Sequence, residues 1–169
     1  KSIVDNAKRH SNSNYIYNID LKAFFHCVEQ GRLWGRLKYP PFNLNEESNR
    51  LEIANIISSL CCNIMEVERI KEGIFIKEKI SVLPQGAPTS PVLTNIICER
   101  LDWKLTGLAN KFGLKYSRYA DDITFSSMHN VYQKNSEFIL KLKKIIESQD
   151  FLIKESKTRL QKQGYRQEV

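Results

Sequence analysis

Two adjacent carboxylates, Asp121 and Asp122, stand in the middle of an apolar stretch rich in β-forming residues. Residues 114–119 before them and 123–125 after them predict a strand, a tight turn and a second strand, with the acids at the tip. At a turn both side chains can lean toward one point, and two like charges so close repel each other unless a positive charge lies between them. The pair therefore indicates a site for a divalent cation. The alternative is an ordinary aspartate-rich turn that binds nothing.

A third carboxylate, Asp20, lies near the end of the apolar run Tyr15–Leu21, which predicts a largely buried strand. Burying an unpaired charge is unfavourable, so Asp20 is either paired with a base or binds a cation. If it lies beside Asp121 and Asp122, three hard oxygen ligands converge, and such ligands favour Mg²⁺ or Mn²⁺. Two such ions roughly 3.5–4 Å apart promote in-line phosphoryl displacement. The chemistry that these residues predict is nucleotidyl transfer.

The composition sets broad limits on the protein. A chain of 169 residues with 41% hydrophobic content suits one domain with an ordinary core. The 26 Lys and Arg residues exceed the 19 Asp and Glu residues, and the net charge of +7 suits a polyanionic partner. Four cysteines without C-x-x-C spacing are expected to be reduced thiols. With no signal segment and no long apolar run, we expect a cytoplasmic protein without a membrane partner, and its abrupt ends suggest a fragment.

The periodicity predicts an α+β fold, in which an antiparallel sheet packs on helices and the strand carrying Asp20 lies beside the carboxylate hairpin. In the first half of the chain we expect a helix over Ser2–His10, a strand over Tyr15–Leu21 and one or two short helices within Lys22–Lys38. A helix opened by a capping box of Asn43 and Glu46 follows, and then a hairpin over Ile64–Val82 that turns at Gly73. In the second half we expect a helix over Pro91–Phe112 ended by Gly113, the carboxylate hairpin, an amphipathic helix over Ser136–Ser148 and a strand over Phe151–Ile153. The basic tail Lys154–Arg166 has no clear pattern.

Three stretches of the chain resemble, in order and spacing, three successive polymerase motifs of bacterial reverse transcriptases. They are Asp20-Leu21-Lys22-Ala23-Phe24-Phe25, the loop Leu83–Pro91 and Tyr119-Ala120-Asp121-Asp122. Residues 6–10, Asn-Ala-Lys-Arg-His, resemble the Asn-Ala-x-x-His signature of the retron branch, and Val169 ends the chain where a Val-Thr-Gly signature would begin. The resemblance implies a polymerase-type palm with part of the fingers over residues 1–169, and a thumb beyond them.

The implied activity is RNA-directed DNA polymerisation, in which dNTPs are added to a primer on an RNA template with two Mg²⁺ ions, for which Mn²⁺ can substitute. By resemblance, Asp20 and Asp121 bind both ions and the carbonyl of Leu21 assists them. Asp122 is the third, more loosely engaged acid. Structured RNA, dNTPs and an RNA–DNA hybrid product are the implied partners, together with an effector protein.

The resemblance also implies residues that contact the incoming nucleotide. Phe25 matches the aromatic ring that excludes a ribose 2′-OH. The alternative for that residue is a core phenylalanine, a role that Phe24 suits better. Gln85 and Gly86 match the loop under the nucleotide and template base, where glycine allows close backbone approach. Lys157 resembles the lysine that protonates the departing pyrophosphate.

Asn6 and His10 are implied to help recognise the cognate RNA, and the alternative is a capped helix with a surface histidine. The sequence departs from relatives at Ala23, where an acid is common, and at His26 and Cys27, where Pro-Ser is common, which leaves contacts to the triphosphate open. Two other functions remain open: a reverse-transcriptase-like scaffold that binds RNA in a defence complex, and a fragment of a group II intron maturase.

Overall fold

The computed structural model describes residues 3–71 and 74–162, which fall into two compact units. One unit combines residues 1–22 with residues 99–169, and the other is formed by residues 23–98. Three features expected from the sequence, at Ser2, Gly73 and Val169, lie outside the described residues.

The first unit is built on a five-stranded sheet in the order β4-β5-β1-β6, with β7 also paired to β1. Its strands are β1 (Tyr15–Lys22), β4 (Lys115–Tyr119), β5 (Asp122–Ser127), β6 (Leu152–Ile153) and β7 (Arg159–Lys162). All the pairings are antiparallel. The prediction that the strand of Asp20 lies beside the carboxylate hairpin is confirmed, because β1 pairs with β5 and Asp20 stands opposite Asp122.

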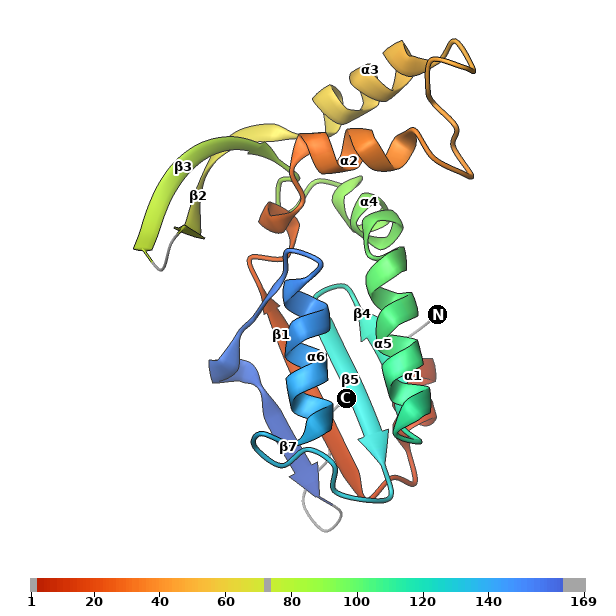
Figure 1. The fold of residues 1–169 in the computed structure, drawn as a ribbon, viewed down its shortest axis with the longest axis vertical. Helices are drawn as coiled ribbons and strands as arrows, with labels where there is room; N and C mark the ends of the chain where they lie inside the picture. Colours follow the sequence, from red (N-terminus) through yellow and green to blue (C-terminus); the bar gives the residue numbers. More distant parts are fainter. Residues whose placement is uncertain (1–2, 72–73, 163–169) are drawn as a thin grey trace. The chain divides into compact units, whose positions relative to one another are not determined.

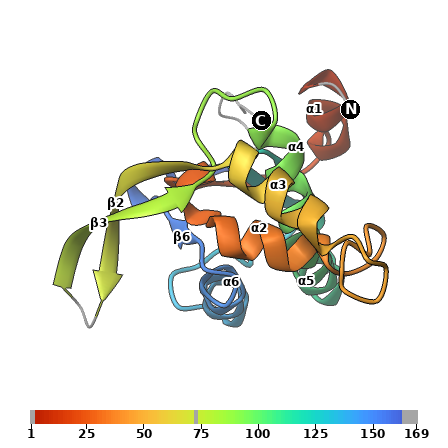
Figure 2. The same ribbon diagram turned by 90° about the horizontal axis from the view of Figure 1, so that it is seen from above.

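Helices cover the two faces of this sheet unequally. The helices of the unit are α1 (Ile3–His10), α5 (Glu99–Lys111), α6 (Glu137–Glu147) and the short η2 (Glu155–Lys157). On one face, Phe125 of β5 packs edge-on against Phe138 of α6 with ring centroids 5.2 Å apart, and Tyr116 of β4 bonds to Asp102 of α5. Helix α1 lies on the opposite side of the sheet from α5 and α6 (Figure 2).

The two faces of the sheet differ because side chains alternate along a strand. Ile19, Ile123 and Phe125 point toward α5 and α6 and are almost completely buried. The alternate positions place Asp20 and Asp122 on the other face. One face of the sheet thus supplies the core, and the other is left for polar residues.

The second unit holds two neighbouring helices and a long hairpin, which Figure 1 shows as a curved ribbon. Its elements are η1 (Phe25–Cys27), α2 (Gln30–Leu37), α3 (Leu51–Cys61), β2 (Asn63–Lys71), β3 (Ile74–Val82) and α4 (Ser90–Ile97). The expected hairpin is confirmed, with Asn63 paired to Val82 at its open end. The chain after β3 is held where the amide of Leu83 donates to the carbonyl of Val28 at 3.0 Å.

The predicted capping box at Asn43 and Glu46 is wrong. Helix α3 begins at Leu51, and the residues before it form a loop in which Asn43 has a positive φ of 51°. Ser48 donates its hydroxyl to the carbonyl of Asn43 at 2.6 Å and its amide to the side chain of Asn45 at 3.0 Å. Such local side-chain bonds satisfy the backbone and compete with helix formation.

The single helix predicted over Pro91–Phe112 is in fact two, α4 and α5, separated at Cys98. Apolar spacing runs on through the break, with Ile97 and Leu101 both buried, so the period does not reveal it. The break coincides with the boundary between the two units, and each helix packs within its own unit. The predicted stop at Gly113 is confirmed by its φ of 66°.

The tail after Ile153 is more ordered than its sequence pattern indicates. It forms η2 and then β7, which pairs with Tyr15–Asn18 of β1. The remaining predicted helices and strands are present within a few residues of their expected bounds. The four cysteines are thiols, as expected. No helix within residues 3–71 and 74–162 is long and apolar enough to cross a membrane.

Candidate active site

The tip of the hairpin β4–β5 is a two-residue turn of Ala120 and Asp121, flanked by the pair Tyr119 and Asp122. Ala120 has a positive φ of 52°. A positive φ at the first turn residue is a feature of the primed hairpin turns, whose twist matches that of the strands. For a residue with a Cβ this region costs roughly 1–2 kcal/mol, so the turn needs contacts that hold it.

The predicted carboxylates converge at this tip. Asp20 lies directly opposite Asp122 in the register of β1 and β5, and the amide of Leu21 donates to the carbonyl of Asp121 at 3.1 Å. Asp20 is buried, Asp121 is half-buried and Asp122 is exposed. The structure therefore brings Asp20 and Leu21 next to Asp121 and Asp122, which follow them about a hundred positions later in the sequence.

The electrostatics reflect the crowding of negative charge. Partial burial raises the pKa of Asp122, and the neighbouring charges of Asp121 and Asp20 raise it further. The positive charge of Lys157 lowers the pKa of Asp122 and so offsets part of this rise. The three carboxylates therefore form an anionic cluster that a cation would stabilise.

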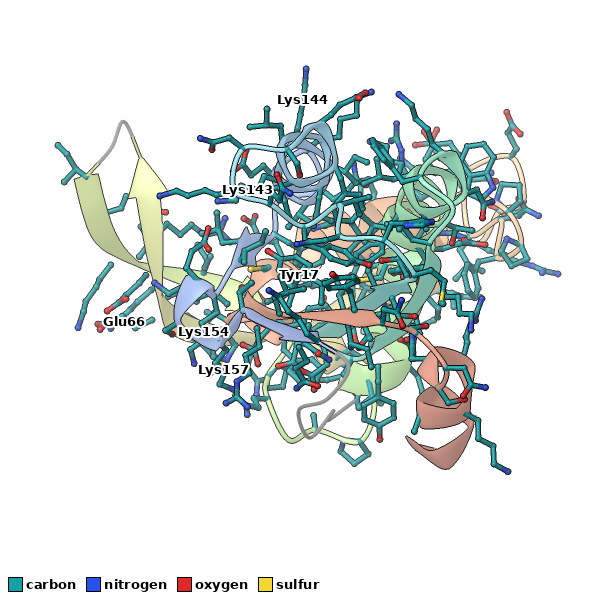
Figure 3. All side chains as sticks on the ribbon, turned by 90° about the horizontal axis from the view of Figure 1, so that it is seen from below. Tyr17, Glu66, Lys143, Lys144, Lys154 and Lys157 are labelled. Atoms are coloured by element: carbon teal, nitrogen blue, oxygen red, sulfur yellow. The ribbon has the colours of Figure 1, made fainter. Side chains whose placement is uncertain are left out.

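Lys157 supplies a positive charge to this cluster. Its Nζ lies 3.0 Å from Oδ2 of Asp20, and this hydrogen bond is the main cause of the raised pKa of Lys157. The lysine lies on η2, and its amide donates to the carbonyl of Lys154 (Figure 3). The amide of Lys154 in turn donates to the carbonyl of Asp20 at 2.8 Å. In this structure Asp20 is thus paired with a base, one of the two alternatives that its buried position required.

The donor set is suited to a hard divalent cation, because all three acids supply carboxylate oxygens. Within the part of the chain that the structure describes, however, no group of three or more His, Cys, Asp or Glu side chains is arranged to hold a metal ion. The ammonium of Lys157 lies against Asp20, where a ligand oxygen would face the ion. The residues fit Mg²⁺ in their chemistry, and an ion bound through Oδ2 of Asp20 would compete with Lys157 for that oxygen.

Of the residues predicted to contact the nucleotide, Lys157 lies in the first unit, and Phe25, Gln85 and Gly86 belong to the second. Phe24 is 3% exposed and is a core residue, whereas Phe25 is half-buried and packs edge-on against it with centroids 5.3 Å apart. Gln85 and Gly86 are both exposed in their loop, and Gly86 has a φ of 90°. This φ is rare for residues with a Cβ. Ser90 steadies the loop by donating to the carbonyl of Pro84 at 2.6 Å.

The expectation of a surface histidine at position 10 is wrong. His10 is completely buried, and its Nδ1 and Nε2 lie 2.8 Å from Oγ of Ser126 and 2.6 Å from Oγ of Ser117. Both ring nitrogens are therefore engaged within the first unit, and the part of His10 in RNA recognition stays a prediction. The imidazole joins α1 to both strands of the carboxylate hairpin. The backbone of Asn6 lies in α1, and its side chain is outside what the structure describes.

Acid should weaken the first unit through His10. Burial, together with the charges of Arg9 and Lys115, lowers the pKa of His10 from 6.5 to about 4. The folded protein therefore binds fewer protons at this site than the unfolded chain, and the stability that the neutral ring contributes is lost as the pH falls below 6.5. We expect the free energy of unfolding to drop by about 2 kcal/mol between pH 7 and pH 5 from this residue alone.

Urea unfolding of the full-length protein, followed by tryptophan fluorescence at the two pH values, measures this loss. His10→Asn should unfold more easily at pH 7 and should show a smaller difference between the two pH values. His129→Asn, at an exposed position, is the matched control and should keep the wild-type difference. An equal pH dependence in His10→Asn and wild type would contradict the assignment.

The sequence interpretation overlooked an ion pair beside the turn, in which the arginine is buried and the aspartate is half-buried. Arg118, 5% exposed in its side chain, bonds to the carboxylate of Asp102 on α5. The signal that could have revealed this ion pair is a charged residue at a core-facing position of a strand. Arg118 stands opposite the buried Ile123, on the core-facing side of β4. A charged residue at such a position needs a buried partner.

Solved structures confirm the class of fold. The structure superposes on the apo telomerase from Candida tropicalis, truncated from its C-terminal domain, with a TM-score of 0.57 and 13% sequence identity. The match covers 98% of this chain and 35% of the telomerase chain. The telomerase from Candida albicans, solved with a fragment of telomeric RNA, gives a TM-score of 0.53 at 14% identity over 96% of the chain and 30% of that protein. The antiparallel sheet with its acidic hairpin, packed on helices, has the fold of a polymerase palm.

The sequence comparison then gives the family. Residues 1–166 match the family described as reverse transcriptase (RNA-dependent DNA polymerase), so the chain belongs to the reverse transcriptases. Within that family it is similar to retron enzymes. The retron Ec86 reverse transcriptase of Escherichia coli is 34% identical over 152 residues, which are 90% of this chain and 37% of the relative. The retron Mx162 reverse transcriptase of Myxococcus xanthus is 31% identical over 100% of the chain and 36% of its own length. The chain thus spans little more than a third of these curated relatives.

Proposed function

We propose that the protein containing this chain is a retron-type RNA-directed DNA polymerase, which transfers nucleotides from dNTPs to a primer on an RNA template. The observation that carries the proposal is the pairing of Asp20 with Asp122 beside the turn that holds Asp121. This pairing joins the acids of two separate polymerase motifs at one end of two adjacent strands in the middle of the sheet. The similarity to retron reverse transcriptases supports the choice of template and product.

The two units suit two parts of such a polymerase. The unit of residues 1–22 and 99–169 carries the sheet and the acids, and we assign it as the palm. Residues 23–98, with the hairpin β2–β3 and the loop of Gln85 and Gly86, are assigned as part of the fingers. Gln85 and Gly86 are then the residues that lie under the incoming nucleotide and the template base.

The acids have distinct roles in this proposal. Asp20 and Asp121 would hold two Mg²⁺ ions with help from the carbonyl of Leu21, and Asp122 would support them from its exposed position. The bound ions would activate the primer hydroxyl and neutralise the leaving pyrophosphate. The backbone bond from Leu21 to Asp121 keeps the two motifs in register while substrate binds.

Lys157 is proposed as the acid that protonates the departing pyrophosphate. Its ammonium already lies beside Asp20, and its raised pKa means that it holds a proton at neutral pH. The lysine must leave the Asp20 carboxylate to reach a phosphate. Its side chain is about half exposed, so it has room to move.

The partners follow from the reaction. They are structured RNA as template and primer source, dNTPs and the RNA–DNA hybrid product. An effector protein is a further proposed partner, which rests only on the similarity to retron enzymes. The net charge of +7 supports binding to a polyanion. Because His10 is buried between two serines, its place in RNA recognition is indirect: it anchors α1, whose exposed residues Lys8 and Arg9 remain available for contact.

Primer extension with the full-length protein tests the function. We expect DNA synthesis from dNTPs on an RNA template with Mg²⁺ or Mn²⁺, and none with a chelator present. A filter-binding assay on the same RNA provides the comparison. Tight RNA binding without any extension in either metal would overturn the polymerase and favour a scaffold that binds RNA.

A further inference from the structure

The carbonyl of Ala120, in the turn that precedes Asp121, is held by a buried arginine. Nη1 of Arg118 donates to this carbonyl at 2.9 Å. The other side of the same guanidinium donates to Asp102 on α5, from Nε to Oδ1 and from Nη2 to Oδ2, each at 2.7 Å. We infer that Asp102 and Arg118 act as a positioning clamp, which fixes the turn and thereby the orientation of Asp121.

The clamp and the sheet together restrain both peptide groups around Asp121. The peptide between Ala120 and Asp121 is fixed through its carbonyl by Arg118, and the following peptide is fixed where the Asp121 carbonyl accepts from Leu21 at 3.1 Å. Ala120, whose carbonyl accepts the first of these bonds, has a positive φ of 52°. A strained residue persists only when its surroundings over-determine it, and the clamp supplies that restraint.

Arginine is suited to this task in a way that lysine is not. Its rigid planar fork has five donors, so one side chain can bind a carboxylate with two bonds and a carbonyl with a third. Asp102 is itself held by the hydroxyl of Tyr116 at 2.6 Å. The Arg118 side chain is 5% exposed and that of Asp102 is 35% exposed, so the guanidinium is shielded from water while its carboxylate partner is half-buried. Helix α5 thus transmits its fixed position to the tip of the hairpin.

The catalytic part of the inference rests on the proposed function. Catalysis by oriented groups depends on geometry held within a fraction of an ångström. Asp102 and Arg118 lie on the core-facing side of the sheet, so they act through the backbone of the turn and do not touch substrate. Loss of the clamp should therefore lower the rate of the chemical step and leave nucleotide binding almost unchanged.

Arg118→Lys in the full-length protein tests the clamp, because lysine keeps the ion pair with Asp102 and cannot also reach the Ala120 carbonyl with the same geometry. Hydrogen exchange, measured by mass spectrometry on peptides covering residues 115–127, should become at least about tenfold faster at the turn. In primer extension kcat should fall about tenfold, while KM for dNTP stays within about twofold. Arg100→Lys, at an exposed position on α5, is the matched control and should match wild type in both measurements.

The two measurements separate this inference from the function on which it depends. The exchange measurement needs no polymerase activity, so the clamp can be tested even if the wild-type protein extends no primer. Unchanged exchange at the turn in Arg118→Lys would overturn the clamp. Faster exchange spread over the whole first unit, or a rise in KM that accounts for the lost activity, would also overturn it, because the arginine would then serve general stability or substrate binding.

Discussion

Asp121→Asn in the full-length protein should reduce template-dependent DNA synthesis by about 10³-fold or more. Asparagine keeps the size of the side chain and one oxygen, but it removes the negative charge that a divalent cation requires. The stabilisation that metal ions give to a phosphoryl-transfer transition state is several kcal/mol, and each 1.36 kcal/mol corresponds to a tenfold change in rate. The loss should appear in kcat, measured by single-nucleotide primer extension.

RNA binding by Asp121→Asn should stay within about twofold of wild type, since phosphate contacts by basic residues dominate that affinity. Asp150→Asn is the matched control: Asp150 is exposed in the same unit, and its φ of 58° is one that asparagine adopts readily. Its activity should be that of wild type. If Asp121→Asn retained more than a tenth of the wild-type rate, the assignment of Asp121 as a metal ligand would be wrong.

Phe25→Ala should let the polymerase accept ribonucleotides, lowering its preference for dNTP over rNTP by about 10²-fold. Phe24, the neighbour of Phe25, is anchored in the core, and its edge-on contact holds the half-buried ring of Phe25 in place. A rigid ring can exclude a 2′-OH by steric contact, whereas alanine leaves room for it. The ratio of kcat/KM for dCTP to that for CTP, measured on one RNA template, gives the preference.

Phe25→Tyr is the matched variant, because it keeps the ring that fills this space. It should discriminate as wild type does. If the ratio did not change in Phe25→Ala while synthesis from dNTP continued, Phe25 would be a packing residue and not a selectivity filter. The exposed Tyr39 of the same unit offers a further control, since Tyr39→Ala should leave the preference unchanged.

Much of the local structure could be predicted from residue patterns alone. Strand β1, hairpin β4–β5 and helix α6 follow from alternation, turn chemistry and apolar spacing, because each of these signals acts over a few neighbouring residues. The predictions failed where other contacts compete with a local pattern. Ser48 and Asn45 bond to backbone groups ahead of α3 and delay its start, and the helix predicted through Cys98 is divided at a unit boundary.

By itself, the sequence determined which chemical groups this protein can use: three hard carboxylates on two β segments, and motifs that resemble those of a reverse transcriptase. Only the tertiary structure decided which groups meet. It paired Asp20 with Lys157, buried His10 between Ser117 and Ser126, and joined Arg118 to Asp102. Local patterns cannot carry this information, because each of these contacts is set by how the strands register and how the helices pack across the sheet.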